Sequence, residues 1–217
     1  GNMARRLLGK GWVVAGLDRT PGVAENLAAE GLGAAATPQE LVGKLSAPRV
    51  IWLMVPAGKA VDETLFGENG LADVLAPGDI IIDGGNSFYK EAEERGEKLK
   101  EKGILFMDVG TSGGPGGALH GACLMIGGEE AAFKNVEPLF KDLAKEDAYR
   151  FFPGFGAGHF VKMVHNGIEY GMMQALAEGF EVLKKSSYNL DLLRITEIYN
   201  NGSVIESRLV GWLKDAF

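Results

Sequence analysis

Short apolar segments alternate with amphipathic segments along the first part of the chain. The apolar segments are rich in β-branched residues, as buried strands are, and they lie at residues 13–17, 50–55, 80–82, 104–109 and 123–126. Helical spacing of apolar residues occurs between several of them, at residues 23–30, 38–44 and 89–102. The charged residues of 89–102 predict a solvated face on an ordinary amphipathic surface helix. The alternation as a whole predicts βαβ units and a largely parallel sheet covered by helices.

The pattern changes after Pro153. Residues 160–185 contain no proline and carry apolar residues on more than one side. This predicts one long, largely buried helix, followed by helices at residues 190–199 and 203–214. We therefore place a domain boundary near residue 155, with an α/β domain at 1–155 and an all-α domain at 156–217.

The first residues have an unusual order. A predicted helix at residues 2–8 is followed by Gly9, Gly11, a strand and Asp18, which is the order of a dinucleotide-binding unit after its first strand and glycine loop. That strand is central in a doubly wound sheet, so a chain without it would leave two strand edges unpaired. We predict a Rossmann-type doubly wound parallel sheet without its first strand and G-x-G-x-x-G loop, and we expect the natural protein to have residues before Gly1.

Composition narrows the class of protein. The 217 residues carry a formal charge of −7, which argues against a nucleic acid or an anionic membrane as the partner. A single cysteine cannot form an internal disulfide, and the three histidines are not clustered at metal-ligand spacing. Neither a signal-peptide pattern nor an apolar run of about 18 residues is present. We expect a cytoplasmic protein without a metal cofactor.

Residues at the predicted strand ends are candidates for cofactor binding. Asp18 could accept hydrogen bonds from a ribose 2′-hydroxyl, which favours NAD, whereas Arg19 could pair with a 2′-phosphate, which favours NADP. The pair leaves both cofactors open, and an aspartate at a strand end is also a common turn residue. Val55, Pro56 and Ala57 end the next predicted strand, at the edge where open α/β sheets bind ligands.

Two glycine-rich turns follow later strands. In the turn at residues 83–87, Asn86 offers both a donor and an acceptor to a ligand, although the sequence is also typical of a plain turn. At residues 110–117, backbone N–H groups and the Ser112 hydroxyl could form an anion-binding nest. A flexible glycine loop is the alternative for this second turn.

Polar residues recur at helical spacing on the long predicted helix. Their i, i+3, i+4, i+7 and i+8 positions share one face and are Lys162, His165, Asn166, Glu169 and Tyr170. The stripe contains a candidate base, Lys162, and a candidate acid, Glu169, about 10 Å apart by helical rise, so they can address different atoms of one small substrate. A solvated stripe is the alternative, but the helix is otherwise apolar, which favours a cavity wall. His159 lies off the stripe.

Three segments resemble the signatures of decarboxylating 6-phosphogluconate dehydrogenases. They are residues 80–87 (IIIDGGNS), 110–114 and, most specifically, 156–171 (GAGHFVKMVHNGIEYG), and the resemblance extends along the whole chain. It implies a Rossmann domain, a helical domain and a homodimer. It also implies metal-free oxidation and decarboxylation of 6-phosphogluconate, a sugar-acid phosphate, to ribulose 5-phosphate with NAD or NADP, in the pentose phosphate pathway.

The resemblance also implies roles for individual residues. Lys162 would be the general base of the oxidation, and Glu169 the acid that protonates the enediol. The positions that match substrate-binding residues of the family are Asn86, Ser112, Gly113, Gly114, His165, Asn166 and Tyr170. Those that match cofactor-facing positions are Asp18, Arg19, Thr20, Val55, Pro56, Ala57 and also Asn86, which therefore belongs to both groups.

The sequence departs from the family pattern near its end. The short stretch between Tyr170 and Gly202 resembles the compact class of the family. Where many members have Val-Ile-Arg-Ser, this chain has Glu206 in place of the arginine that grips the substrate phosphate, and a glutamate cannot do so. Arg208, or a partner subunit, is then the expected phosphate ligand. We also expect that a C-terminal segment which reaches a partner in the family lies beyond Phe217.

Two other functions remain open at this point. The first is another β-hydroxyacid dehydrogenase, such as one acting on 3-hydroxyisobutyrate, although such an enzyme would not need the Glu169–Tyr170 pair. The second is a catalytically silent fragment that serves only in assembly, which the absent glycine loop and C-terminal segment would explain.

Overall fold

The computed structural model describes residues 1–217 and divides them into two compact units, Gly1–Met163 and Val164–Phe217. The first unit is α/β and the second is helical. The units divide later in the chain than residue 155, because the first turns of the long helix α9 (Ala157–Lys185) pack on the sheet of the first unit.

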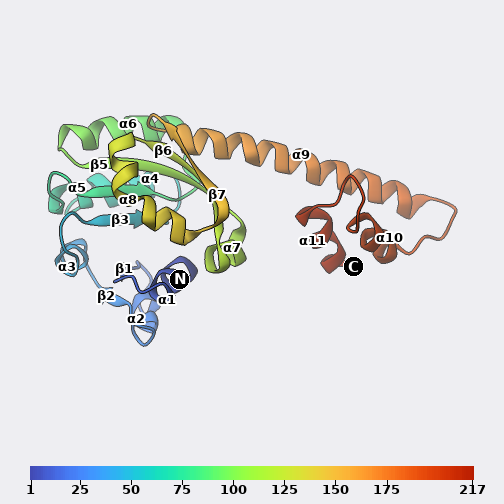
Figure 1. The fold of residues 1–217 in the computed structure, drawn as a ribbon, viewed down its shortest axis with the longest axis horizontal. Coiled ribbons are helices and arrows are strands. Elements are labelled where there is room, and N and C mark those ends of the chain that lie inside the picture. Colours follow the sequence, from blue (N-terminus) through green and yellow to red (C-terminus); the bar gives the residue numbers. More distant parts are fainter. The chain divides into compact units, whose positions relative to one another are not determined.

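The first unit contains seven strands (Figure 1). They are β1 (Ala15–Leu17), β2 (Gly33–Ala35), β3 (Val50–Leu53), β4 (Ile80–Asp83), β5 (Leu105–Ser112), β6 (Ala122–Gly128) and β7 (Ala144–Pro153). Strands β3 to β7 form one five-stranded sheet in chain order, in which only the β5–β6 pair is antiparallel. The predicted α/β class with a mainly parallel sheet is confirmed.

Strands β1 and β2 form a separate, two-stranded parallel sheet. Strand β1 is paired only with β2, and β3 only with β4, so each has one edge without a strand beside it. These are the two unpaired edges that the order of elements at the start of the chain predicted.

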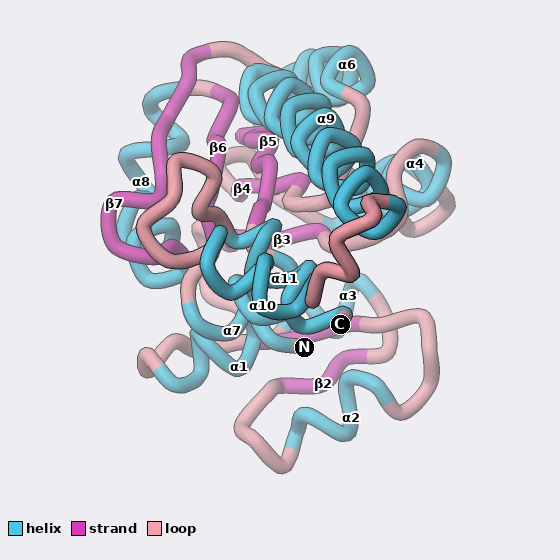
Figure 2. Tube along the Cα trace, turned by 90° about the vertical axis from the view of Figure 1, so that its right-hand side faces the viewer, coloured by secondary structure: helices cyan, strands magenta, loops and turns pink.

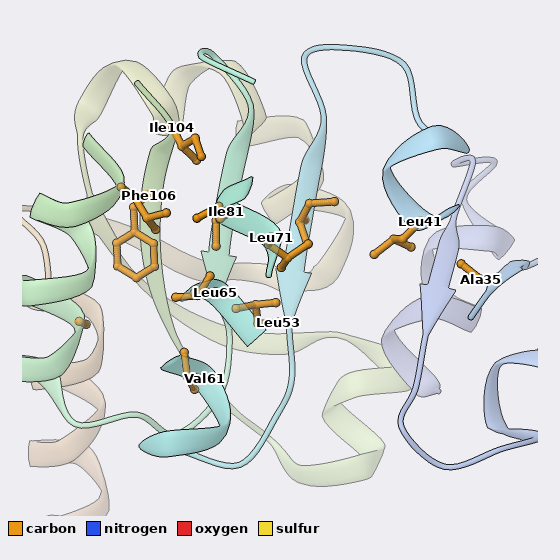
Figure 3. Close-up of a cluster of buried hydrophobic side chains, with 13 residues drawn as sticks. Ala35, Leu41, Leu53, Val61, Leu65, Leu71, Ile81, Ile104 and Phe106 are labelled. Carbon is orange, nitrogen blue, oxygen red and sulfur yellow. The ribbon is translucent and has the colours of Figure 1, made fainter. Parts of the chain in front are cut away.

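Helices cover both faces of the five-stranded sheet. The helices of this unit are α1 (Asn2–Gly9), α2 (Val23–Ala28), α3 (Pro38–Gly43), α4 (Lys59–Phe66), α5 (Leu71–Val74), α6 (Tyr89–Glu101), α7 (Gly114–His120) and α8 (Glu130–Leu143). Side chains of α3 to α6 pack with Leu53, Ile81 and Phe106 in one apolar cluster (Figure 3). Helices α8 and α1 close the other face over Ile82 and Val109. Figure 2 shows β3 to β6 between α8 on one side and α4 on the other.

Several elements differ from the sequence-based expectations. Strands β2 and β7 and helix α8 were not predicted, because β2 consists of small residues, β7 is rich in charge and α8 contains Pro138. The single turn predicted at residues 110–117 is wrong: β5 continues to Ser112, and α7 begins at Gly114. Gly113 and Gly114 have positive φ angles (121° and 61°), and the chain turns there between β5 and α7.

The second unit consists of helices from α9 onward, with α10 (Leu192–Tyr199) and α11 (Arg208–Ala216). The helix predicted from residue 203 begins later, because the Ser207 hydroxyl caps it by accepting a hydrogen bond from the Val210 N–H at 3.2 Å. A small core forms around Phe180, whose ring contacts Tyr199 and Phe217. The prediction that α9 is largely buried is wrong for this chain: Ile168, Tyr170 and Val182 are 61%, 71% and 70% exposed. None of the helices has the length and apolar character needed to cross a membrane.

A buried ion pair fixes the amino end of β4. Asp79 is 1% exposed and accepts hydrogen bonds from the backbone N–H of Arg49 (2.7 Å) and Ala76 (2.9 Å) and from the Arg49 guanidinium (3.0 Å). Burial by itself raises the pKa of Asp79, but these donors outweigh burial, and the pKa is lowered. The carboxylate therefore stabilises the fold in its charged form.

Asp79→Asn should lower the free energy of unfolding at pH 7 by about 1–3 kcal/mol, because a buried N–H loses its acceptor. A lowered folded-state pKa contributes stability that is present above the unfolded pKa of about 4 and is lost as the pH falls through the folded value. The difference between the two proteins in urea unfolding should therefore shrink below about pH 4. A difference that stays constant from pH 7 to pH 3 would contradict this role of Asp79.

Candidate active site

Apart from Lys162 on α9, the candidate residues of the first unit lie at or just after the carboxyl ends of strands. Strands β3, β4 and β5 are parallel, with Leu53 paired to Asp83 and Asp83 to Asp108, so the turns that follow them meet at one edge of the sheet. This edge brings together four sets of predicted site residues: 55–57, Asn86, Ser112 and 113–114.

The turn after β1 contains the predicted ribose-facing residues. Asp18, Arg19 and Thr20 are all exposed. One carboxylate oxygen of Asp18 accepts a hydrogen bond from the Thr20 N–H at 2.8 Å, which closes a tight local turn. The carboxylate is thereby oriented while staying open to a ligand.

The turn after β4 is held by the fully buried carboxylate of Asp83. Its two oxygens accept hydrogen bonds from the Gly85 N–H at 3.1 Å and the Ser87 hydroxyl at 2.7 Å. Asn86 lies between these two fixed residues and is exposed. A side chain at Gly85 would come within 3.1 Å of the Val55 carbonyl oxygen. The turns after β3 and β4 therefore pack directly on each other.

The end of β5 is tied to the same edge. The Thr111 hydroxyl lies 3.4 Å from the Gly84 carbonyl oxygen, to which it donates a hydrogen bond. Ser112 and Gly113 follow and are half-buried, while Gly114 is exposed. The positive φ of Gly113 is a conformation that residues with a side chain rarely adopt.

Asp108, within β5, fixes the first turn of α9. Its fully buried carboxylate accepts hydrogen bonds from the backbone N–H of Gly156 (2.8 Å) and His159 (2.7 Å). The His159 ring is also buried, with Nδ1 3.9 Å from an Asp108 oxygen. Burial raises the pKa of Asp108, although His159 and the two N–H groups oppose the shift. The sequence offered one signal for this cap, an acidic residue inside an apolar strand, and our sequence analysis missed it.

Glycines let α9 lie close against β5 and β6. A side chain at Gly110 would overlap Cβ of Lys162, and one at Gly158 would overlap the carbonyl oxygens of Asp108 and Met125. Lys162 is accordingly buried, at 9% exposure. The backbone of β5 thus holds the candidate base beside the edge that carries Ser112.

The remaining polar residues of the stripe belong to the second unit. Helix α9 is continuous, so the spacing predicted for the stripe is present. His165 Nδ1 lies 3.2 Å from the Asn166 side-chain oxygen and 3.6 Å from a Glu169 oxygen, and both His165 and Glu169 are half-buried. Tyr170 is exposed. Across the chain, no group of three or more His, Cys, Asp or Glu side chains is placed to hold a metal ion.

The two residues discussed for phosphate binding are both exposed. The Glu206 carboxylate accepts a hydrogen bond from the Gly202 N–H at 2.8 Å, which closes the turn before α11. The Arg208 guanidinium lies over the Trp212 ring, 5.9 Å from its centroid. Glu206 thus has a local structural partner, and Arg208 keeps its charge at the surface of α11.

Comparison with known families assigns the class of protein first. Residues 1–156 match the model of the NAD binding domain of 6-phosphogluconate dehydrogenase, and residues 158–187 match that of its C-terminal domain. These matches define a nicotinamide-dinucleotide-binding domain followed by the beginning of a second domain. The chain belongs to the 6-phosphogluconate dehydrogenase family, as the sequence segments predicted.

Individual relatives agree with this assignment. One relative is a Bacillus subtilis protein that carries the provisional name 6-phosphogluconate dehydrogenase. It is 44% identical over 100% of this chain and 71% of its own length. The NAD(+)-dependent, decarboxylating 6-phosphogluconate dehydrogenase of Haloferax volcanii is 43% identical over 90% of this chain and 66% of its own length.

Solved structures share the fold. The 6-phosphogluconate dehydrogenase of Plasmodium falciparum, studied with NADP+ and with 6-phosphogluconate, superposes with a TM-score of 0.89 at 31% identity. The superposition covers 99% of this chain and 48% of that one, so the chain spans about half of this relative. A 3-hydroxyisobutyrate dehydrogenase from Salmonella typhimurium superposes with a TM-score of 0.81 at 25% identity, over 99% of this chain and 74% of its own.

Gly110→Ala should disturb the candidate site through the contact with Lys162. The added methyl group would overlap the lysine side chain, and we expect a loss of about 1–3 kcal/mol in the free energy of unfolding. Displacement of Lys162 by about 1 Å should lower turnover on the order of 100-fold in the full-length protein. Urea unfolding and steady-state kinetics measure the two effects.

Gly43→Ala is the matched control, because Gly43 lies in helix α3 with no atom within 4 Å of the added methyl group. It should leave turnover unchanged and stability equal or higher by up to about 1 kcal/mol. Equal behaviour of the two variants would show that α9 is not held closely against β5.

Proposed function

We propose that the protein containing this chain oxidises and decarboxylates 6-phosphogluconate to ribulose 5-phosphate and CO₂, with hydride transfer to NAD or NADP. The observation that carries the proposal is the position of Lys162. The first carbons of this buried side chain lie against Gly110, two residues before Ser112, at the sheet edge where Asn86 is presented. The names of the relatives that match most of the chain support the same reaction.

The turns after β1 and β3 fit a dinucleotide. Asp18 is oriented by the Thr20 N–H and could accept hydrogen bonds from a ribose, while Arg19 beside it could pair with a 2′-phosphate. Pro56 and Ala57 are exposed in the turn after β3, where a ligand can approach the backbone. The nicotinamide, when bound, supplies the hydride acceptor. The chemistry of Asp18 and Arg19 is compatible with NAD and with NADP.

In the proposed reaction Lys162, as the neutral amine, accepts the proton of the C3 hydroxyl while the C3 hydride leaves. The resulting 3-keto acid loses its carboxyl group as CO₂. The electron pair of the broken C1–C2 bond forms a C2–C3 double bond, and the C3 oxygen takes a proton back from Lys162, which gives an enediol. Glu169 then donates a proton to the enediol carbon that carried the carboxyl group, while the C3 hydroxyl returns its proton to Lys162. We assign to Asn86, Ser112, Gly113, Gly114, His165, Asn166 and Tyr170 the role of holding the substrate, with Arg208 or a partner subunit at its phosphate.

The substrate is tested by assaying the full-length protein with NAD and with NADP. We expect reduction of the dinucleotide and stoichiometric CO₂ release with 6-phosphogluconate, and no turnover of 3-hydroxyisobutyrate. The shared fold with a 3-hydroxyisobutyrate dehydrogenase makes that acid the informative competitor. Activity on the short acid alone would overturn the proposal. Inactivity on both, with no dinucleotide bound in calorimetry, would instead support an assembly role.

We further propose that the protein acts as a homodimer in the cytoplasm. Support for the dimer comes from the apolar side chains that the second unit leaves exposed, among them Ile168, Val182 and Ile198, because such surfaces commonly mark interfaces between proteins. The single free cysteine, Cys123, is compatible with a reducing compartment. Light scattering of the same preparation gives the molar mass, and a monomer at micromolar concentration would contradict the dimer.

Lys162→Met should abolish hydride transfer, with a loss of at least about 100-fold, because methionine cannot accept the hydroxyl proton. The fold should change little, since the methionine side chain has a similar length and volume. Pre-steady-state formation of the reduced dinucleotide is the measurement.

Glu169→Gln, on the same helix, is the control that separates the two roles. It should retain hydride transfer and slow only the later protonation, so that the reduced dinucleotide forms in a burst before steady state. Near-normal hydride transfer in Lys162→Met would remove Lys162 from the role of base.

A further inference from the structure

Arg95 of helix α6 is a charged side chain inside the first unit. It is 1% exposed and is one of the largest fully buried side chains. Its Nε donates a hydrogen bond to the Asp62 carboxylate of α4 at 2.7 Å. Its Nη2 donates to the Glu91 carboxylate at 2.9 Å and to the Gly58 carbonyl oxygen at 3.2 Å. One guanidinium group therefore connects α6 with the start of α4.

The third nitrogen of Arg95 faces a different element. Nη1 lies 4.0 Å from the nearer carboxylate oxygen of Asp83, at the end of β4, and makes no hydrogen bond in the structure. Both oxygens of Asp83 already accept hydrogen bonds, from Gly85 and Ser87. Arg95 thus supplies the positive charge beside the buried carboxylate that orders the Asn86 turn. Burial disfavours the charge of Arg95, but Asp62 and Glu91 outweigh burial and raise its pKa, so the guanidinium remains charged.

The contacts of Arg95 reach both ligand-facing turns. Gly58 ends the turn after β3 that contains Pro56 and Ala57, while Asp83 begins the turn that presents Asn86. We propose that Arg95 is a positioning residue that holds the turn after β3, on the cofactor side, at a fixed separation from the turn after β4, on the substrate side. The proposal deepens the proposed function and rests on it for the identity of the substrate.

Stability alone is a weak reason for such a buried ion pair. Desolvation of the charges commonly cancels the attraction between them, and apolar replacements are often as stable. A role in geometry explains the choice of arginine, because its planar fork can reach several acceptors at once, whereas lysine is a single point charge. Lysine at this position could keep a charge near Asp83 but could not keep the contacts with Asp62, Glu91 and Gly58 together.

Arg49→Lys provides a matched control for Arg95→Lys. Arg49 and Arg95 each lie beside a buried aspartate at one end of β4. Asp79 directly precedes the strand, whereas Asp83 is its last residue, at the carboxyl end where the turns lie. Both substitutions replace a guanidinium by an ammonium beside a buried carboxylate. Only Arg95→Lys should change the separation of the ligand-facing turns.

The experiment measures the dissociation constant of the dinucleotide by calorimetry, KM and kcat of the full-length enzyme, and Tm for both variants. We expect Arg95→Lys to weaken dinucleotide binding and raise the substrate KM, each about tenfold, while Arg49→Lys leaves both constants unchanged at a similar loss of Tm. If Arg95→Lys lowers Tm but leaves both constants as in the unsubstituted protein, Arg95 is only a structural residue and the proposal is wrong.

A second variant keeps the test decisive if Arg95→Lys does not fold. Asp62→Asn removes one partner charge that is 51% exposed, and it should weaken dinucleotide binding by about threefold; unchanged affinity would overturn the proposal. Dinucleotide affinity does not depend on which acid is oxidised. Failure of the proposed function would appear as inactivity of the unsubstituted protein on 6-phosphogluconate, whereas failure of the Arg95 proposal would appear as unchanged binding in the variants.

Discussion

The cap that Asp108 forms on the first turn of α9 is the interaction on which the candidate site depends most. Two backbone N–H groups at the start of this helix would be buried without a partner, and the Asp108 carboxylate satisfies both. The positive end of the helix dipole in turn favours a negative charge at this place. Because Gly110 and Gly158 leave no side chain in the contact, the helix and strand approach closely. The position of Lys162 is therefore set by backbone, which varies less than side-chain packing.

On the neighbouring strand, a second buried carboxylate likewise orders the residues from which it accepts hydrogen bonds. Asp83 is the register partner of Asp108, and both follow the apolar positions Ile81 and Phe106 on the face covered by α4 and α6. This face is hydrophobic in its centre and acidic at the ligand-binding edge. Each carboxylate there accepts hydrogen bonds from the residues that it orders. A buried polar or charged group needs such partners to be stable. The apolar core and the site are thus consecutive positions of the same strands.

The sequence predicted elements whose signal is local. The apolar runs of β3, β4 and β5 are buried strands, and the polar stripe of residues 162–170 lies on a continuous helix, as its spacing indicated. Strand β7 was not predicted because three consecutive charged residues follow its first residue, and such a run is typical of a surface segment. The site residues in the turns follow strand ends that periodicity could locate, so their placement at one edge was predictable.

The features that were missed depend on contacts between distant residues. Within the charge run of α6, Arg95 looked like its solvated neighbours, but the structure buries it among Asp62, Asp83 and Glu91, so the expectation of a plain solvated face is wrong at this position. The spacing of residues does not show that Arg95 is buried in a charged helix. It also does not show that the strand position beside Lys162 must be a glycine. Both follow from which helix crosses which strand, and this is a property of the assembled sheet.

The two ends of the candidate site are held by different forces. Asn86 follows β4 and Ser112 ends β5, and these strands belong to one hydrogen-bonded sheet. Asp18 follows β1, whose sheet shares no hydrogen-bonded pair with β3. Ala35 of β2 and Leu41 of α3 join the small sheet to the large one through the apolar cluster. Side-chain packing tolerates small displacements more readily than a ladder of backbone hydrogen bonds does. The residues that would distinguish NAD from NADP therefore lie on the more adjustable part of the unit, and those that would address the substrate lie on its more rigid part.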